Sequence, residues 1–361
     1  MGPCKSSLFI VFSLSGVLLV GCSSTPLTSS PVGTTISTSS GTSSSGGVFT
    51  TSNPPIFSTS PDTYATNIFV TENAPSGNGT SITGSIVTYP VSSTGSAVAA
   101  SPSVAPVTGA VFAQVRGDGS GHVYFISYGE TSAAAITVSE YSATNGIPTP
   151  VRAFTTTLAS SLAAMAADVM GDVFLSESNG LLLEFPPSAS GPATPSKTVQ
   201  FPSPLNAMGT DGSGALYASV TGSTKISQFA AGFTSAAPSA TIDVAAYVRA
   251  VDDLAIDPFR QIYVVGADTH GNPALFQFPG VTSSPTPGIT ISGSSTLLPT
   301  GPNSLAVDGD DNIYVEGASA ASPGHDVFLV FSSTASGNVS PSYTFTGSAL
   351  ASGTGKGIAV Y

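Results

Sequence analysis

Aspartate closes several short apolar runs at equivalent places along the chain. The clearest examples are Asp168, Asp211, Asp257 and Asp308, and Asp118 is the expected equivalent in an earlier copy. A carboxylate at the end of a strand can accept backbone N–H hydrogen bonds in the turn that follows. A catalytic acid is needed once rather than in every copy. The recurrence therefore favours a structural role for these aspartates.

The three histidines of the chain are the next candidates for chemistry. His122 begins a predicted strand beside one of the aspartate turns, whereas His270 and His325 fall in loops at the opposite end of the strands. Three zinc ligands must lie within about 2.1 Å of the same ion, so we expect no three-histidine site. A two-histidine site, His270 and His325 aided by Asp268 or Asp326, is the remaining metal candidate. We expect no required cofactor, although a calcium or zinc ion is possible.

The aspartates belong to a repeated phrase that opens on an aliphatic–aromatic pair. The copies lie about 43 to 55 residues apart, the spacing of four-stranded propeller blades. A second aromatic residue follows each pair, and a Gly/Ser/Pro-rich turn comes next. The pairs are Ile68-Phe69, Val123-Tyr124, Val173-Phe174, Leu216-Tyr217, Ile262-Tyr263 and Ile313-Tyr314. The second aromatics, Tyr89, Tyr141, Phe185, Phe229, Phe278 and Phe331, are predicted to pack between blades.

The two ends of this repeated region complete each other. The first copy has a second strand, residues 67–71, but no clear inner strand before it. The chain finishes with Gly-Ile-Ala-Val-Tyr at residues 357–361, which matches Ser-Leu-Ala-Val-Asp at residues 304–308. Pairing the ends would close a ring and leave no open edge between first and last blades. We therefore predict an all-β fold, a six-bladed β-propeller closed by the C-terminal strand.

The repeat resembles that of NHL-type six-bladed β-propellers. The closest matches are Leu-Ala-Val-Asp at residues 305–308, Asn-Ile-Tyr-Val at 312–315 and Gly-Ile-Ala-Val at 357–360. The resemblance implies the fold and leaves the activity open, because blades are scaffolding for variable loops. The acid that usually follows the second strand in this family survives only as Glu72 and Glu177.

Gluconolactonase-like propellers, which also have six blades, suggest an alternative. They bind a divalent cation in the axial mouth through Glu, Asn and Asp side chains, and such an ion can polarise a carbonyl or activate water. Arg249 and Lys356 could balance charge there or contact an anionic ligand. The comparable mouth residues in this chain are Glu72, Glu177, Asn206, Asp252, Asp253, Asn303 and Glu316. A metal-dependent hydrolase or lyase is thus the alternative function.

The N-terminus reads as an export signal. Lys5 precedes an apolar run, residues 8–20, that is too short to remain as a membrane-spanning helix. The run ends in Leu-Val-Gly-Cys, which resembles the bacterial lipobox and predicts lipidation at Cys22. Residues 1–21 would be the signal peptide, 22–60 a Ser/Thr/Gly/Pro-rich disordered tether and 61–361 the propeller. We expect a protein anchored to the bacterial cell envelope, with the outer membrane the preferred destination.

Composition narrows the function further. The net charge of −12 repels phosphate backbones, which excludes nucleic-acid binding. Once Cys4 is removed with the signal and Cys22 is acylated, no thiol remains for disulfides or catalysis. The chain also lacks a nucleophile elbow, a phosphate loop and a His-Glu-x-x-His motif.

We therefore expect a monomeric, non-catalytic scaffold that binds an envelope protein or glycan. The longer predicted loops at residues 72–81, 267–273 and 318–325 would supply contacts with that partner.

Overall fold

The computed structural model describes most of the repeated region. The described residues are 67–75, 82–91, 95–97, 102–129, 132–143, 148–282, 285–318, 325–351 and 357–361. The predicted signal peptide, the lipidation site at Cys22 and the tether lie outside these residues, as do parts of the loops at 72–81 and 318–325.

Three separate sheets of the described residues contain four antiparallel strands each. The first consists of β9 (Leu162–Ala167), β10 (Val173–Glu177), β11 (Leu181–Phe185) and β13 (Lys197–Gln200). The second consists of β14 (Leu205–Thr210), β15 (Leu216–Val220), β16 (Lys225–Phe229) and β17 (Ala240–Asp243). The third consists of β18 (Val248–Ile256), β19 (Ile262–Asp268), β20 (Pro273–Phe278) and β21 (Ile289–Ser292).

The other described strands form two larger sheets. One joins β22 (Pro302–Val307), β23 (Ile313–Ala318), β24 (His325–Phe331) and β25 (Tyr343–Ala351) to the short β3 (Gly95–Ala97). The other contains two antiparallel sets. These are β26 (Ile358–Val360), β1 (Asn67–Pro75), β2 (Ile82–Pro90) and β4 (Pro102–Thr108), and then β5 (Ala110–Gly117), β6 (His122–Gly129), β7 (Ser132–Ser142) and β8 (Thr149–Thr157). A parallel pair, Thr83 with Ala110, connects the two sets, and β12 (Gly191–Pro192) pairs with β8.

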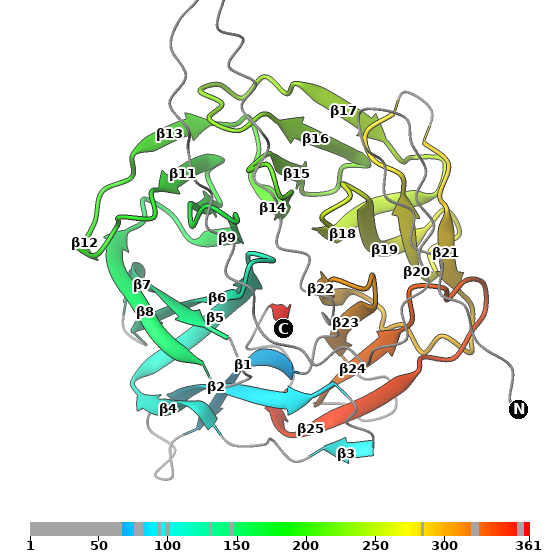
Figure 1. The fold of residues 1–361 in the computed structure, drawn as a ribbon, viewed down its shortest axis with the longest axis horizontal. Coiled ribbons are helices and arrows are strands. Elements are labelled where there is room, and N and C mark those ends of the chain that lie inside the picture. The colour runs from blue at the N-terminus through cyan, green and yellow to red at the C-terminus, as the bar shows by residue number, and fades with distance from the viewer. Residues whose placement is uncertain are drawn as a thin grey trace, which may run out of the picture. The chain divides into compact units, whose positions relative to one another are not determined.

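The sheets are arranged around a centre, as in a β-propeller (Figure 1). The strands that begin each set, β5, β9, β14, β18, β22 and β26, contact one another in sequence and close a ring. We call these the inner strands. Every regular element in the described residues is a β-strand. The described residues contain no helix long and apolar enough to cross a lipid bilayer. The prediction of an all-β propeller is therefore confirmed.

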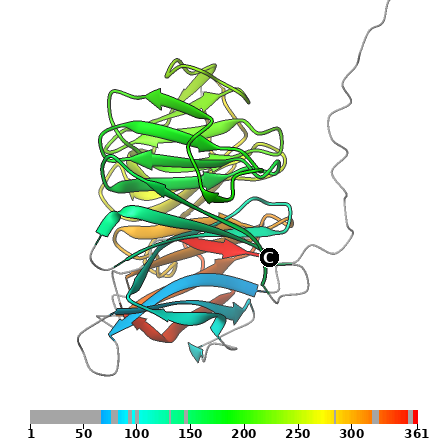
Figure 2. The ribbon, with the colours of Figure 1, turned by 90° about the vertical axis from the view of Figure 1, so that its left-hand side faces the viewer.

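The C-terminal strand closes the ring as predicted. β26 lies antiparallel to β1, with Ile358 opposite Val70 and Val360 opposite Ile68 (Figure 2). Asn67 and Tyr361 exchange backbone hydrogen bonds of 2.8 and 3.0 Å beyond the ladder. Because β26 comes from the far end of the sequence, it covers the inner edge that β1 would otherwise expose.

The hydrophobic core lies between neighbouring sets of strands. Each of the six clusters of buried side chains in the described residues combines residues from two consecutive sets. The predicted second aromatics fill these seams, with Tyr141 as the exception, since it is only half-buried against Phe125. Large aromatic side chains in the seams supply much of the burial energy, at about 25 cal/mol per Å² of apolar surface removed from water.

Candidate functional site

The recurrent aspartates serve the turns that follow the inner strands. In the clearest turn, Asp308 accepts backbone N–H bonds from Asp310 at 3.0 Å and Asn312 at 2.9 Å, and the Tyr314 hydroxyl donates to it at 2.8 Å. Comparable backbone bonds reach Asp118, Asp168, Asp211 and Asp257. The predicted structural role of these carboxylates is confirmed. We call this end of the inner strands the Asp-turn end.

Buried tyrosines reinforce these turns. Tyr217 donates its hydroxyl hydrogen to Asp211 at 3.2 Å in the same arrangement as Tyr314 with Asp308. Burial, followed by the charge of the adjacent aspartate, raises the pKa of Tyr124, Tyr217 and Tyr314. Their hydroxyls therefore stay protonated and remain hydrogen-bond donors.

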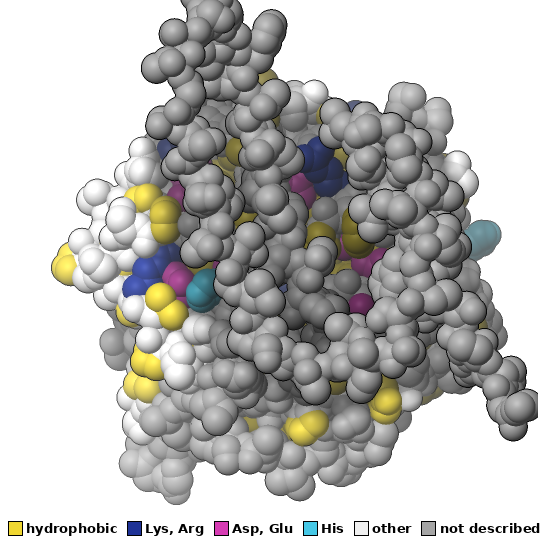
Figure 3. Space-filling model, in the orientation of Figure 1, with side chains coloured by type: hydrophobic (Ala, Val, Ile, Leu, Met, Phe, Trp, Pro, Cys, Tyr) yellow, Lys and Arg dark blue, Asp and Glu magenta, His cyan; other side chains and the backbone are white. Residues whose placement is uncertain are grey.

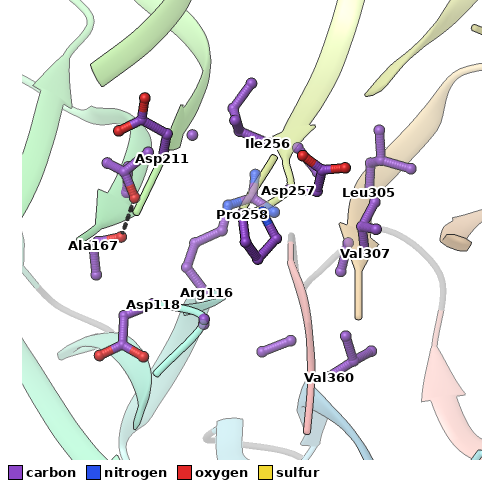
Figure 4. Close-up of a pocket in the computed structure, with 18 of the residues that line it drawn as sticks. Arg116, Asp118, Ala167, Asp211, Ile256, Asp257, Pro258, Leu305, Val307 and Val360 are labelled. Atoms are coloured by element: carbon purple, nitrogen blue, oxygen red, sulfur yellow. Dashed lines mark hydrogen bonds between the residues drawn. The ribbon is translucent and has the colours of Figure 1, made fainter. Parts of the chain in front are cut away.

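A cavity of about 160 Å³ opens on the axis at the Asp-turn end (Figure 4). Apolar side chains of five inner strands line it, among them Met208, Leu254, Leu305 and Ile358. The aspartates stand around its edge. The Thr210 hydroxyl donates to the Ala167 carbonyl at 2.6 Å and joins two neighbouring inner strands beside it.

Arg116 of β5 crosses the middle of this region. Its Nη2 lies 3.0 Å from both carboxylate oxygens of Asp253 on β18, its Nη1 donates to Ser304 Oγ at 2.7 Å, and its Nε donates to the Met165 carbonyl at 3.4 Å. Asp253 is almost fully buried, and burial raises its pKa above the ordinary value, a rise that the charge of Arg116 offsets only in part. An ion pair in such surroundings is held by its additional hydrogen bonds.

The same network reaches two further backbone groups. Asp253 accepts the N–H of Leu305 at 2.9 Å, and Ser304 Oγ accepts the N–H of Ile358 at 2.9 Å. It thus ties together five of the six inner strands in the described residues, and sequence reasoning missed it. The sequence did contain a signal for it. Arg116 lies two residues before the turn aspartate Asp118, and the other five copies have a small residue at the equivalent position. Those small residues are Ala166, Gly209, Ala255, Ala306 and Ala359.

The opposite end of the inner strands carries a repeated backbone irregularity. In five of them the described register shifts by one residue, which is a β-bulge. Bulges bend a strand and re-aim its side chains. The extra residues are Ala113, Ala163, Asn206, Asp252 and Asn303, and the register of β18 shifts a second time at Arg249. We call this the bulged end, and it is where the sequence predicted an axial mouth.

Two amides near the bulges keep unused acceptors. Asn206 donates from Nδ2 to the Val251 carbonyl at 3.2 Å, and Gln114 donates from Nε2 to the Ala163 carbonyl at 3.2 Å. The side-chain oxygens of both residues are buried and accept no hydrogen bond. The Asp252 residue is exposed overall, but its carboxyl group is partly shielded from water, and this burial, followed by the charge of Asp253, raises its pKa.

The predicted mouth residues do not all converge. Asp253 and Glu316 lie near Arg116, whose charge influences both. Glu177 instead anchors a loop, accepting the N–H groups of Ala159 at 3.1 Å and Ser160 at 2.8 Å. Arg249 is exposed beside the β19–β20 loop. For Glu72 and Asn303 only the backbone is described, and Lys356 lies outside the described residues.

Glu316 is the most isolated acid of the set. It is 2% exposed, accepts the Gly357 N–H, and its Oε2 has no hydrogen-bond donor. Burial, followed by repulsion from Asp326, raises its pKa well above the ordinary value. Burial thus favours the neutral form of the Glu316 carboxyl group.

The predicted metal candidates are held in different ways. Asp268 accepts the N–H groups of His270 and Asn272, each at 2.8 Å, while the His270 side chain is 83% exposed. Asp326 is buried near Glu316, and His325 is described only as the first residue of β24. Within the described residues, no three His, Cys, Asp or Glu side chains converge where an ion could bind.

His122 takes part in a second cluster at the Asp-turn end. Its Nδ1 lies 3.1 Å from Asp118 Oδ2, and its Nε2 lies 4.0 Å from Glu140, which pairs with Arg152. These residues line a cavity of about 150 Å³. Figure 3 shows basic, acidic and histidine side chains side by side on the left of this face. The hydrogen bond to Asp118 raises the pKa of His122.

Comparison with known proteins gives no family. No protein-family model matches the chain, and no curated protein matches it. A protein of unknown function from Bacteroides caccae is 8% identical, with 82% of this chain and 99% of that chain covered and a TM-score of 0.49. The WD40 β-propeller domain of Doa1 is 14% identical, with 64% of this chain and 71% of that chain covered and a TM-score of 0.39. The RRP9 WD40 repeats are 9% identical, with 62% of this chain and 61% of that chain covered and a TM-score of 0.41. These likenesses are weak, and the propeller arrangement described above follows from the strand pairing of the chain itself.

Proposed function

We propose that this chain is a bacterial cell-envelope lipoprotein whose propeller is a non-catalytic binding scaffold. Dividing the largest sheet at the single Thr83–Ala110 pair gives six sets of four antiparallel strands, which supports an NHL-like, six-bladed arrangement. The lipobox-like sequence before Cys22 supports the lipid anchor.

The observation that carries the binding function is the axial cavity at the Asp-turn end. Its walls are mainly apolar, as in most sites that bind ligands or side chains. The aspartates at its edge already accept bonds from turn N–H groups, so they favour a rigid rim over proton transfer. Rigid rims bind without the entropy cost of ordering loops.

Photo-crosslinking in whole cells tests the binding function. A photoreactive residue replacing Pro258, which lines the cavity, should yield one specific crosslinked partner. The same residue replacing Val107, which is 45% exposed on the outer strand β4, is the matched control. Equal crosslinking at both positions, or none at Pro258, would argue against the scaffold.

The lipid anchor has its own test. Cells grown with a labelled fatty acid should incorporate the label into the full chain, which should sediment with membranes. Cys22→Ser should abolish both. A Cys22→Ser protein that still carries label would contradict lipidation at this residue.

The alternative, a metal-dependent hydrolase or lyase, would work from the bulged end. The unused oxygens of Gln114, Asn206 and Glu316 favour it, because oxygen ligands suit hard cations such as calcium. Elemental mass spectrometry of the purified chain tests this. One metal ion per chain that is lost in Asn206→Leu and Glu316→Gln but kept in Asp243→Asn would favour the enzyme. Metal that is lost only when His270 and His325 are replaced would assign the loop site instead.

A further inference from the structure

The axial cavity at the Asp-turn end has the size of one large apolar side chain. An engineered apolar cavity of about 150 Å³ accommodates benzene, and this one measures about 160 Å³. Its floor is closed by Arg116, which is already paired with Asp253. A cationic group entering deeply would meet that guanidinium, so the interior favours an uncharged group.

The edge of the cavity has the opposite character. Asp118, Asp211, Asp257 and Asp308 all line it. Arg260 sits near this edge and is paired with Asp211 at 3.1 Å, as Arg116 is paired with Asp253. The carboxylates therefore outnumber the cations available to neutralise them, and a cleft lined by one sign of charge attracts the other.

Neighbouring acids in the same turns show this negative field. Asp310 and Asp311 follow Asp308 after Gly309. Burial, with the charges of Asp257, Asp308 and Asp310 adding to it, raises the pKa of Asp311 to about 6. A cation docking here would relieve that repulsion.

Apolar side chains extend the rim outward. Phe259 and Met170, 74% and 65% exposed, are the most exposed large hydrophobic residues in the described part of the chain. Each directly follows a cavity-lining residue, Pro258 or Val169. The two thus lie on turns of different sets of strands, next in sequence to residues of the axial cavity, and Met170 itself lines the second cavity, that of His122 and Arg152.

We propose that this mouth docks a segment of a protein partner that inserts one Leu- or Phe-sized side chain, flanked by Lys or Arg residues. The apolar side chain fills the cavity, the flanking cations pair with the rim carboxylates, and Phe259 and Met170 cover the segment on either side. The proposal rests on the binding function proposed above and names the chemistry of the partner.

Short peptides test this chemistry on the full chain purified in detergent. The probe is amidated Lys-Lys-Phe-Lys-Lys, compared with Lys-Lys-Gly-Lys-Lys and Glu-Glu-Phe-Glu-Glu by isothermal titration calorimetry. Because burying a phenyl group gains about 1.5–3 kcal/mol, the first peptide should bind at least about tenfold more tightly than the glycine peptide. The acidic peptide should not bind. Equal affinity of the phenylalanine and glycine peptides would overturn the proposal.

Variants locate the binding. Ala306→Leu fills the cavity and should remove the advantage of the phenylalanine peptide. Phe259→Ser alters a mostly exposed side chain, keeps the fold and should weaken binding severalfold. Asp257→Asn keeps a side-chain oxygen that can accept the Gln261 N–H but removes the negative charge, so it should lower the salt dependence of binding. Asp243→Asn on the outer strand β17 removes the same charge elsewhere and should change nothing.

Two further results would overturn the proposal. Affinity unchanged in both Ala306→Leu and Phe259→Ser would place the peptide elsewhere, and affinity lowered equally by Asp257→Asn and Asp243→Asn would reduce it to general attraction. If the peptides fail while Pro258 still crosslinks a partner in cells, the scaffold function stands and this partner chemistry is wrong. If the crosslinking also fails, the scaffold function fails with it.

Discussion

The two ends of the inner strands repeat different things. At the Asp-turn end the same side chain recurs in five turns: in all five it accepts the N–H of the residue four positions on. In four of them it also accepts the N–H of the residue two positions on. At the bulged end the same backbone irregularity recurs in five strands, while the extra residue changes from alanine to asparagine to aspartate. One end is uniform in side chain and the other only in backbone.

This difference separates structural acids from variable ones. A carboxylate that satisfies two turn N–H groups cannot be replaced without leaving donors unpaired. A bulge is set by the backbone and accepts many residue types. Side-chain variation at the bulged end therefore costs little stability, whereas the Asp-turn end varies mainly in the residues after each aspartate, such as Met170 and Phe259.

The largest expected effect comes from the arginine that links the two ends. Arg116→Ala leaves the buried Asp253 carboxylate unpaired, which should lower the free energy of unfolding by about 3–5 kcal/mol. Urea unfolding measures this. Arg249→Ala, an exposed arginine at the bulged end, should stay within about 0.5 kcal/mol. Equal losses in the two variants would show that the axial network does not stabilise the ring.

Replacing one aspartate at each end tests the comparison directly. Asp308→Ala removes the acceptor for Asp310, Asn312 and the Tyr314 hydroxyl, and should lower the free energy of unfolding by about 2–3 kcal/mol. Asp252→Ala should change it by at most about 0.5 kcal/mol. The same urea titrations report both, and a larger loss in Asp252→Ala would reverse our assignment of the two ends.

The change of stability with pH should be a smaller effect than these two losses. Its direction should be opposite to that of most proteins, which lose stability as the pH falls. The folded-state pKa of Asp168 and of Asp311 is raised to about 6, and burial raises that of Glu316 well above its ordinary value. Unfolded carboxyls titrate near pH 4, so the folded state binds more protons between these values. The contribution of these three groups to the free energy of unfolding is therefore fully present below about pH 4, and it is lost as the pH rises through their folded-state pKa values.

Chemical unfolding at pH 5, 6 and 7.5 measures this trend. The free energy of unfolding should be higher at pH 5 than at pH 7.5. Glu316→Gln keeps an acceptor for the Gly357 N–H and should flatten the dependence on pH. A maximum at pH 7.5 in the unaltered protein would refute the prediction.

The smallest effect concerns one histidine at the Asp-turn end. Proton NMR titration of His122 should give a pKa above its ordinary value of 6.5, because Asp118 accepts a hydrogen bond from the protonated ring. Asp118→Asn should lower the pKa of His122. No change in that variant would assign the shift to Glu140 instead.

Part of this site could be predicted from sequence because it depends on local contacts. The carboxylate of Asp308 bonds to groups two and four residues away, so its role follows from the turn sequence. The roles of Glu177, at the end of β10, and Glu316, within β23, could not be assigned, because their neighbours come from distant parts of the chain. The sequence pattern grouped them as mouth residues. Packing buried both, and it paired Glu177 with the N–H groups of a loop and left Glu316 without a hydrogen-bond donor at Oε2.

The sequence by itself determined the repeat, the turn aspartates and the closing strand. Each follows from short-range periodicity, or from the match between residues 357–361 and 304–308. Only the tertiary structure decided what fills the axis. Arg116 meets Asp253 and Ser304, which are 137 and 188 residues away along the chain. Such pairs form only when the ring closes, because ring closure sets the distance across the axis and no local pattern encodes it.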